Sequence, residues 1–460
     1  MSGHSDVSNA FADLVAEARY EDLSPDAVDK AKKSVLDTLG VILAASGVEP
    51  RVRALVDLVQ DNGGRTESSV LGFGRRAPAA EAAFANGAMA HCLDFDDRTR
   101  WGAHSGSSAV PAAFALAERK GGIPGRQMIM AIALAQDMFV RLRCNVGWQQ
   151  DWNLSPVLGV FSATLAASRV LGLNGEQAAN ALGIASMQSS GTMETIFAVG
   201  SDLRGMYAGF AAKGAVTAAL LAQKGVTGIS SLFEGKAGIF NVYFGGKYQR
   251  EEMLKNLGRD YTGATMLYKP WPAVGISHTY IHATIELMKE HRLNPSDIEE
   301  IRVWVGSFQQ RMCHPLEERR APATPVDAKF SLPFCVAIAA SRSRVGISDF
   351  LADALKKSDV LALAQKVVPI EDSSVDWTTK SPEARVAITT RDGRTFERVG
   401  NNVPGSPEAP ITWEGIAAKF EDCASAAALP LSVDKINTAQ EMARNLESLD
   451  DATELLRVLS

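Results

Sequence analysis

Residues 79–97 read Ala79-Ala-Glu-Ala-Ala-Phe-Ala-Asn-Gly-Ala-Met-Ala-His91-Cys92-Leu-Asp94-Phe-Asp96-Asp97. The part up to Cys92 is rich in alanine and has apolar residues at three- and four-residue spacing, which predicts a helix. Asp94 ends this helix and opens a Gly- and Ser-containing loop that runs to His104. Because the helix is built from small side chains, neighbouring helix backbones can approach it closely. This stretch therefore indicates a domain made of tightly packed helices.

The same pattern extends in both directions from this stretch, from the start of the chain to about Gly263. The predicted helices have apolar residues at helical spacing and glycine near their ends. They are Pro25 to Ser46, Ala79 to Cys92, Pro111 to Lys120, Pro124 to Leu142, Ser162 to Leu171, Gly175 to Gln188 and Tyr207 to Lys224.

The composition changes near Tyr268, where prolines begin to separate shorter elements. We predict a helix over 278–291, a strand over 298–305, and a hairpin over 384–397 that turns at Asp392-Gly393. Helical patterning returns after the proline-rich stretch at 404–410. The expected fold is therefore mainly α. A large all-helical domain would comprise residues 1–268 and 405–460, and a smaller α+β lid domain residues 269–404.

The bulk properties exclude several classes of function. The 460 residues are 46% hydrophobic and carry a net charge of −6 without a block of Lys or Arg, which argues against a nucleic-acid partner. No apolar run reaches the roughly 18 consecutive residues that a membrane span requires, and the start Met1-Ser-Gly-His-Ser-Asp lacks a signal-peptide pattern. Five dispersed cysteines fit reduced thiols rather than a metal or iron–sulfur site. We expect a cytoplasmic protein with neither membrane nor nucleic-acid partner.

Two short motifs suggest functions that their contexts disfavour. Gly72-Phe-Gly74-Arg-Arg-Ala77 matches a dinucleotide fingerprint, but Pro78 follows at once and the next segment is helical, so the second strand of a nucleotide-binding unit is missing. Asp94-Phe-Asp96-Asp97 matches the acidic motif of type II terpene cyclases. Their cavities need many aromatic side chains to stabilise carbocations, whereas aromatic residues make up only 7% of this chain.

Three stretches resemble the MmgE/PrpD family. The first and most specific is 85–97 together with His104-Ser-Gly and Val110-Pro-Ala-Ala. The second is Tyr207-Ala-Gly-Phe-Ala-Ala-Lys-Gly, and the third is Lys269-Pro-Trp-Pro, which leads to His278. The resemblance covers nearly the whole chain. It implies a helical domain and an α+β domain with a cleft between them, usually in a homodimer, and chemistry that needs no metal or organic cofactor.

The residues of these stretches suit proton transfer next to a carboxylate. Removing such a proton requires a positioned base and cations that hold the developing enediolate charge. Asp94 and His104 come together at the ends of one loop, and an imidazole exchanges protons near pH 7. We therefore take Asp94, His104, Tyr207 and Lys269 as catalytic candidates. The candidates for substrate binding are Arg98, Asn153, Arg204 and His278, with arginine suited to bidentate contact with a carboxylate.

The chain also departs from the pattern of the family it resembles. Asn153 stands where a second histidine is usual, Arg204 replaces a lysine, and Tyr207 replaces a histidine. Three further replacements are Arg98 for a threonine, Phe334 for a tyrosine and Gly275 for an arginine. Asn cannot act as a general base, and Arg stays protonated. Tyr207 would serve as a proton carrier if Arg204 and Lys269 depressed its pKa.

These departures disfavour 2-methylcitrate and cis-aconitate as substrates and favour another small di- or tricarboxylic acid. The first expectation is a hydro-lyase, because dehydration is the best-represented chemistry of the family that the chain resembles. An epimerase or isomerase of a dicarboxylate comes second and a decarboxylase third. The remaining alternative is a carboxylate-binding protein that has lost catalysis with the second histidine.

Overall fold

Alanine- and leucine-rich segments form the helices of the large domain in the computed structural model, which describes residues 5–198, 201–376 and 383–460. Residues 1–4, which belong to the start used above for the signal-peptide expectation, lie outside the described part. The helices of the large domain are α1 (Val7–Glu17), α2 (Pro25–Val48), α3 (Pro50–Asp61), α4 (Ala79–His91), α5 (Gly106–Lys120), α6 (Gly125–Asn145), α7 (Leu154–Leu171), α8 (Gly175–Ala185), α9 (Glu194–Phe197), α10 (Leu203–Gln223), α11 (Ile239–Phe244), α12 (Arg250–Leu254), α19 (Trp413–Ser425), α20 (Val433–Arg444) and α21 (Glu454–Val458).

The centre of this domain is the close packing of α10 against α4 and α7, with α5 between the latter two. Glycines make the approach possible. A Cβ added to Gly87 would lie 2.9 Å from the Cα of Gly209, and one added to Gly209 would lie 2.4 Å from the backbone oxygen of Phe84. The small residues of α4 and α10 therefore set the distance between the two helices, as the sequence predicts.

Among the described residues, two helices have the length and composition of membrane spans, α7 and α10. Within their apolar windows, 89% of the α7 residues and 67% of the α10 residues are buried in this fold. The sequence analysis found no apolar run suited to a membrane span and predicted only the second half of α7, which extends over Leu154–Leu171. Burial inside the bundle accounts for the apolar character of both helices.

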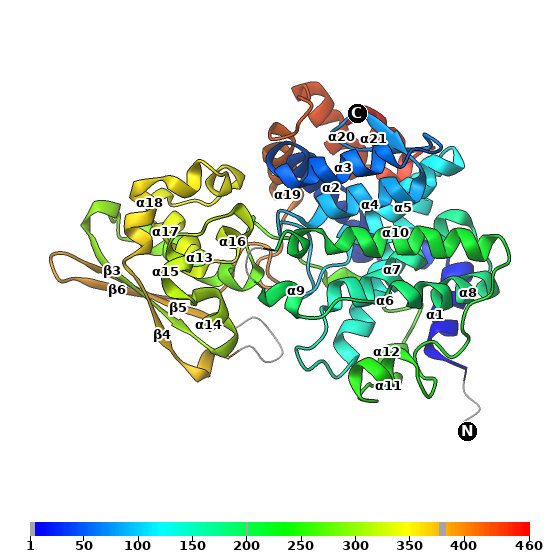
Figure 1. Cartoon of the computed structure of the whole chain (residues 1–460), viewed down its shortest axis with the longest axis horizontal. Coiled ribbons are helices and arrows are strands. Elements are labelled where there is room, and N and C mark those ends of the chain that lie inside the picture. Colours follow the sequence, from blue (N-terminus) through cyan, green and yellow to red (C-terminus); the bar gives the residue numbers. More distant parts are fainter. Residues whose placement is uncertain (1–4, 199–200, 377–382) are drawn as a thin grey trace.

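The small domain is a four-stranded sheet covered by helices, to the left in Figure 1. The strand order is β4-β3-β5-β6, with β3 parallel to β4 and antiparallel to β5. Helices α13 and α17 pack on each other and on the sheet. Its elements are α13 (His278–Glu290), β3 (Ile298–Val305), α14 (Ser307–Cys313), α15 (Leu316–Arg320), α16 (Pro325–Lys329), α17 (Leu332–Arg342), α18 (Ser358–Ala364), β4 (Val367–Glu371), β5 (Ala384–Thr390) and β6 (Thr395–Gly400).

The fold class expected from the sequence, a large helical domain with a smaller α+β domain, is confirmed. Two separate hydrophobic cores accompany the two lobes. One is formed by residues between Val7 and Tyr261 together with the C-terminal helices, with Tyr268 and Ile347 added, and the other by residues between Ala273 and Ile388. The chain thus enters the small domain once and returns to the large one, where α19 packs on α2 (Figure 1).

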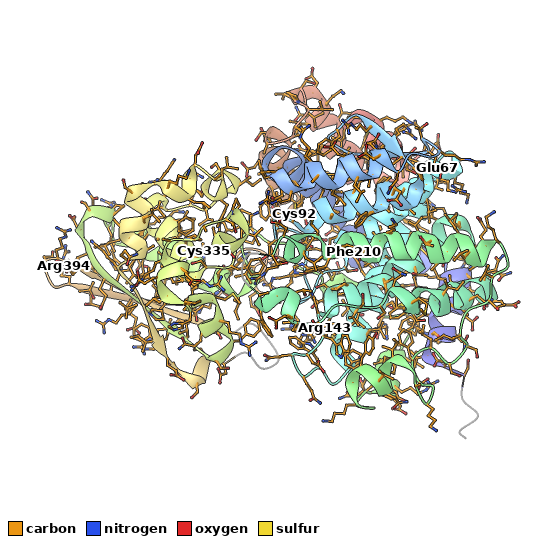
Figure 2. The ribbon with its side chains drawn as sticks, in the orientation of Figure 1. Glu67, Cys92, Arg143, Phe210, Cys335 and Arg394 are labelled. Carbon is orange, nitrogen blue, oxygen red and sulfur yellow. The ribbon has the colours of Figure 1, made fainter. Side chains whose placement is uncertain are left out.

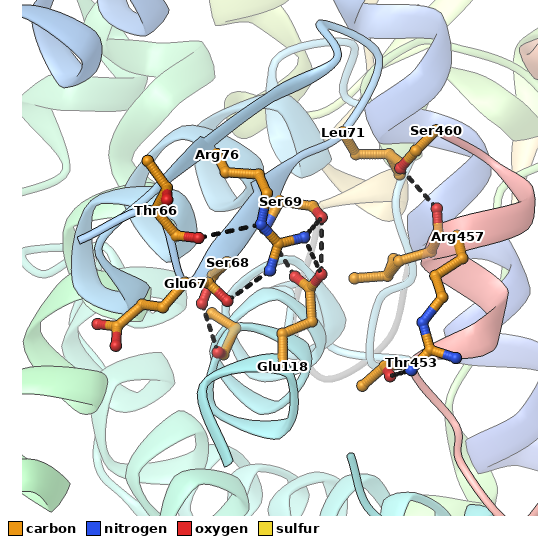
Figure 3. A network of polar contacts seen from close by, with 12 residues as sticks. Thr66, Glu67, Ser68, Ser69, Leu71, Arg76, Glu118, Thr453, Arg457 and Ser460 are labelled. Atoms are coloured by element: carbon orange, nitrogen blue, oxygen red, sulfur yellow. Dashed lines mark hydrogen bonds and ion pairs between the residues drawn. The ribbon is translucent and has the colours of Figure 1, made fainter. Parts of the chain in front are cut away.

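The Gly72-x-Gly74 motif forms the turn of a two-stranded hairpin, β1 (Ser68–Val70) and β2 (Arg75–Ala77). Figure 3 shows how the hairpin is tied to α5. Glu118 accepts hydrogen bonds from the backbone and hydroxyl of Ser69, both at 2.7 Å, and from Arg76 at 3.0 Å. Both glycines have positive φ, 79° and 60°, which a tight turn requires. The motif therefore forms the turn of an antiparallel hairpin and not the strand-to-helix turn of a dinucleotide-binding unit.

Candidate active site

Asp94 is held next to Lys269 by the loop that follows α4. Its φ is 48°, a left-handed conformation that aspartate tolerates better than most residues. Lys269 Nζ donates to Asp94 Oδ1 at 2.6 Å and to the Asp94 backbone oxygen at 2.8 Å. Asp94 Oδ2 is buried and has no hydrogen-bond partner among the described residues. One oxygen of this carboxylate is thus neutralised, and the other is available to a ligand.

The crossing between the domains brings Lys269 to this position. Arg98 and Leu267 exchange backbone hydrogen bonds, both at 2.8 Å, and so join the Asp94 loop to the segment that precedes Lys269. The returning segment packs on the same place, since a Cβ on Gly405 would lie 2.1 Å from the backbone oxygen of Tyr268. The site therefore lies where the chain passes between its two domains.

His104 lies beside Asp94 with a defined ring orientation. Its Nδ1 is 2.6 Å from the backbone oxygen of Asp97 and 3.2 Å from Asp96 Oδ2, both of which accept hydrogen bonds. In the neutral ring these acceptors place the proton on Nδ1 and leave the lone pair on Nε2. His104 Nε2 is 3.9 Å from Asp94 Oδ1. Its basic nitrogen therefore faces the same space as Asp94.

Asp96 links His104 to a second histidine, His91. The Asp96 oxygens lie 3.1 and 3.0 Å from His91 Nδ1, and the Asp96 side chain is fully buried. Burial favours the neutral acid, but the charges of His104 and then His91 outweigh it and hold the pKa of Asp96 well below its usual range. Asp96 is therefore an ionised bridge that orients both imidazoles. The sequence analysis gave neither Asp96 nor His91 a role.

Two further buried carboxyl groups lie behind this bridge. Burial, and then the charges of Asp96 and Asp37, raise the pKa of Asp97 to about 7. Burial likewise raises the pKa of Asp37 to about 6, although Lys419 contacts it at 2.6 Å. Asp97 Oδ1 accepts a hydrogen bond from the backbone N–H of Gly106 at 3.0 Å, at the start of α5. This carboxyl group thus helps to fix the loop that carries His104.

Two arginines, Arg98 and Arg143, bring positive charge to the site, and neither forms an ion pair within 4 Å in the described part of the chain. Arg98 packs over Gly275, where a Cβ would meet its Cδ at 3.2 Å. Arg143, at the end of α6 (Figure 2), donates from Nη2 to the backbone oxygen of Trp101 at 2.7 Å. Its Nε is buried and has no hydrogen-bond partner among the described residues. Burial lowers the pKa of both guanidinium groups to about 10, so they stay charged near neutral pH.

The pairing of Arg98 with Gly275 explains two departures from the expected pattern together. An arginine is expected at 275 and a smaller residue at 98. Here the guanidinium comes from Arg98 and fills the space that a side chain at 275 would need. The cationic group is therefore retained but reaches the site from the large domain instead of the small one.

Tyr207 contributes a ring and a hydroxyl group rather than a base. Its ring lies 4.3 Å from that of His91. Burial, and then the charge of Asp96, raise the pKa of Tyr207 far above its usual value. The condition set for its use as a proton carrier, a pKa depressed by Arg204 and Lys269, is therefore not met. Tyr207 therefore remains protonated near neutral pH and does not serve as a base.

Asn153 lies at the N-terminus of α7 and caps this helix. Its Oδ1 accepts from the Ser155 backbone N–H at 3.2 Å, and its Nδ2 donates to Thr195 Oγ1 at 3.1 Å. Both ends of the carboxamide are thus engaged within the protein. Asn153 forms part of the cavity wall and holds the start of α7 in place.

These side chains surround a cavity of about 810 Å³, including its opening to solvent. Six of the eight candidates from the sequence line it, namely Asp94, Arg98, His104, Asn153, Tyr207 and Lys269. Arg204 and His278 are not among its lining residues. The Arg204 guanidinium lies 3.1 Å from the centre of the Phe330 ring, which itself faces the cavity.

His278 faces a neighbouring cavity that shares Arg98 and Gly275 with the first. Its Nε2 is 3.1 Å from the backbone oxygen of Ala273. Burial, and then the charges of Lys269 and Arg98, hold the pKa of His278 well below its usual range. A neutral His278 is suited to support the Lys269 segment rather than to bind a carboxylate directly.

Four side chains of the site form a donor set that a metal ion could use. Donor atoms of His91, Asp94, Asp96 and His104 all lie within 4.8 Å of one another. The Lys269 ammonium group is 2.6 Å from Asp94 Oδ1 and would repel a divalent cation bound at this carboxylate. The set therefore fits a protonated network better than a metal site.

The sequence matches the family model of the MmgE/PrpD N-terminal domain over residues 9–252 and that of the C-terminal domain over residues 271–447. The chain belongs to the MmgE/PrpD family. The resemblance drawn from the three motifs is thereby confirmed. The C-terminal MmgE/PrpD model extends past the small domain into α19 and α20, which pack with the large domain.

Several MmgE/PrpD proteins are similar to this chain at low identity. The cis-aconitate decarboxylase-like protein oryM of Aspergillus oryzae is 27% identical over 477 residues, which cover 99% of this chain and 97% of its own. Human cis-aconitate decarboxylase is 23% identical over 470 residues, 98% and 94% of the two chains. The 2-methylcitrate dehydratase of Salmonella typhimurium is 25% identical over 417 residues, 86% and 85% of the two chains.

Sequence reasoning missed three polar residues of this MmgE/PrpD site, His91, Asp96 and Arg143. His91 and Asp96 stand inside the most specific motif, where polar residues at the end of an alanine-rich helix were the available signal. Arg143 belongs to the otherwise apolar stretch Phe139-Val-Arg-Leu-Arg143. A charged residue on the buried side of such a helix usually has a partner or a function.

Proposed function

We propose that this protein is a lyase that transfers a proton at a carbon next to a carboxylate in a small di- or tricarboxylic acid. The observation that carries the proposal is the Asp94–Lys269 pair beside His104 Nε2, in a cavity that also holds the charged Arg98 and Arg143. Asp94 Oδ2 or His104 removes the proton, Lys269 stabilises charge next to it, and the guanidinium groups bind substrate carboxylates.

Dehydration is the leading reaction. Elimination of water needs one group that takes the proton and another that protonates the departing hydroxyl group. Asp94 and His104 lie within 3.9 Å of each other and so act on the same region of a bound substrate. An epimerase that uses two bases needs them on opposite faces of one carbon, which this proximity does not favour.

Decarboxylation is the second candidate. The relatives that match 98% or more of this chain carry the name cis-aconitate decarboxylase or a name derived from it, whereas the matching dehydratases cover 83–86%. The sequence analysis ranked decarboxylation third. We now rank it second, because the decarboxylases match more of the chain than the dehydratases do. Both reactions share proton transfer at the carbon next to a carboxylate.

The test is a panel of hydroxy-, amino- and unsaturated di- and tricarboxylic acids incubated with the enzyme in D₂O. Deuterium incorporated next to a carboxylate supports proton transfer. A rise in ultraviolet absorbance from a new C=C then indicates dehydration, and released CO₂ indicates decarboxylation. Binding of a panel member without exchange or product would replace the proposal with a carboxylate-binding protein.

We also propose that the reaction needs no metal ion, since Lys269 supplies the positive charge at Asp94. After exhaustive chelation and desalting, turnover of the substrate found above should stay within twofold of its original value. Loss of activity that one divalent ion restores would assign the His91, Asp94, Asp96 and His104 cluster to a metal instead. The cytoplasmic location expected from the sequence is likewise a proposal, which fractionation of cells would test.

A further inference from the structure

The cavity also has an apolar surface, which proton transfer does not require. Much of its wall is apolar and is formed by Trp101, Trp148, Met193, Ile196, Phe308 and Phe330. These residues come from loops of the large domain, from α9 and its flank, and from α14 and the end of α16 in the small domain. Both domains therefore contribute apolar surface to the same cavity.

The aromatic wall is held in place by the protein. The Trp148 indole N–H donates to the Trp152 backbone oxygen at 2.8 Å, and the Trp148 ring lies 4.9 Å from the Arg143 guanidinium. Phe330 is fixed between the cavity and Arg204. These rings are thus a preformed surface against which an apolar group of a ligand can be buried.

The charged groups of the cavity explain how the carboxylates of a ligand would bind, but not what would contact the apolar wall. Lys269 is paired with Asp94, which leaves Arg98 and Arg143 as the guanidinium groups that line the cavity and form no ion pair within 4 Å in the described segments. Two guanidinium groups match two carboxylates. A compact polyacid would have no apolar surface to set against the tryptophans, and a carboxylate buried there without a cation is unfavourable.

We propose that the substrate is a dicarboxylate that carries an apolar substituent longer than a methyl group, an alkyl chain or an aromatic ring. The carboxylates pair with Arg98 and Arg143, and the substituent lies against Trp148, Ile196 and Phe308. This inference names the substrate class of the site and rests on the proposed function for its chemistry. Its recognition step is a binding equilibrium, which can be measured without turnover.

The first experiment is calorimetric titration of the enzyme with succinate, 2-methylsuccinate, 2-butylsuccinate and 2-benzylsuccinate, none of which has a hydroxyl group to lose. Burial of one methylene group contributes about 0.8 kcal/mol, which is about fourfold in affinity. Affinity should rise by about that factor per methylene from methyl to butyl. Equal affinity across the series, an affinity that falls with length, or no binding of any member would overturn the inference.

A matched pair of variants locates the substituent. Ile196 is half-buried at the cavity, whereas Ile229 is 56% exposed elsewhere on the large domain. Ile196→Ala should weaken 2-butylsuccinate binding about tenfold and succinate binding less than twofold, and Ile229→Ala should change neither. An equal loss for both ligands in Ile196→Ala, or no loss for either, would contradict the proposed contact.

The two proposals fail in different ways. If substituted succinates bind in the expected order but no hydroxy or unsaturated analogue exchanges deuterium, the proposed lyase function is wrong and the ligand class stands. If unsubstituted acids turn over and the substituted ones neither bind nor react, the lyase function stands and the apolar substituent is wrong.

Discussion

His104 and Asp94 face the same part of the cavity, but their hydrogen-bond partners differ and so do the roles that we expect for them. The lone pair of His104 Nε2 is set by acceptors on its Nδ1, whereas Asp94 is tied through Oδ1 to Lys269. Loss of a positioned general base costs about 10²–10⁴-fold in rate. His104→Ala should lower kcat within that range and change KM less than threefold in steady-state kinetics. Near-normal turnover would move proton transfer to Asp94 Oδ2.

Asn153 offers the matched contrast, since it lines the same cavity but caps α7. Asn153→Ala should raise KM more than it lowers kcat, and the lost cap should cost about 1 kcal/mol in the free energy of unfolding. Asn153→His should not raise turnover of the native substrate, because Arg98 and Phe334 have departed from the usual pattern as well. If Asn153→Ala lowered kcat as much as His104→Ala, Asn153 would have to take part in the chemical step in addition to lining the cavity and capping α7.

Asp96 contacts both imidazoles, and we expect it to act on the reaction through them as a positioning residue. Replacing Asp96 by Asn removes the buried negative charge next to His104 Nδ1, which disfavours the imidazolium form. The acid limb of the kcat/KM profile should move to lower pH in Asp96→Asn, and kcat should fall at least tenfold because the base is weaker. Asp96→Glu should restore part of the activity. A uniform loss without any change in the pH profile would indicate a merely structural role.

At the scale of an element, Asp97 joins the catalytic loop to the first turn of α5. Its pKa is about 7 in the folded protein and about 4 in the unfolded chain, so the native state holds a proton that the unfolded state has lost between these values. The free energy of unfolding therefore falls as pH rises through this window, and the loss is complete above pH 7.

Asp97→Asn removes this titration and keeps an acceptor for the Gly106 N–H. Relative to the original chain, the variant should gain at least about 1 kcal/mol in the free energy of unfolding between pH 5 and pH 8.5. Urea denaturation at both pH values measures this gain, with the exposed Asp450→Asn as control. A stability difference that does not change with pH would show that Asp97 does not titrate in this window.

The elements also show where sequence reasoning succeeds. The strand at 298–305 coincides with β3, the hairpin turns at Asp392-Gly393, and the helix from 278 ends one residue earlier than predicted. The alternating burial along β3 and the positive φ of Gly393, 85°, depend on neighbouring residues in the sequence, so local patterns predict them. The helix ending near Cys92 was placed equally well, since α4 ends at His91.

The starts of several helices were predicted too late, and the reasons are not local. We expected α5 to begin at Pro111, but it begins at Gly106, whose N–H is held by Asp97 from across the loop. We expected α7 to begin at Ser162, but Asn153 caps it. The site follows the same rule. The motif provides Asp94 and His104, whereas Arg143 joins them in the cavity wall through the packing of α6, which spacing along the chain cannot reveal.

At the scale of the whole molecule, we propose that two copies of this chain associate through the outer face of α10. Leu203, Phe210 and Leu221 are 45%, 50% and 37% exposed, and their separations are close to whole numbers of helical turns. Figure 2 shows Phe210 on this helix. An exposed apolar stripe on a helix of this length is typical of an interaction surface.

Light scattering coupled to size-exclusion chromatography should give twice the chain mass for the unmodified protein at micromolar concentration. Phe210→Glu should shift it to a monomer, whereas Val433→Glu, at a 68% exposed position on α20, should not. A monomer at all concentrations, or a dimer unaffected by Phe210→Glu, would exclude this face.

The return of the chain to its first domain also has a consequence for synthesis on the ribosome. Asp37 of α2 is buried, and Lys419 of α19, the cation that contacts it, is translated 382 positions later. At about 5–20 residues per second, α2 waits roughly 20–80 s for that partner. The small domain needs no later segment for its sheet, because β3 to β6 are made in one continuous stretch. The second domain of the sequence is therefore the first that a nascent chain can complete.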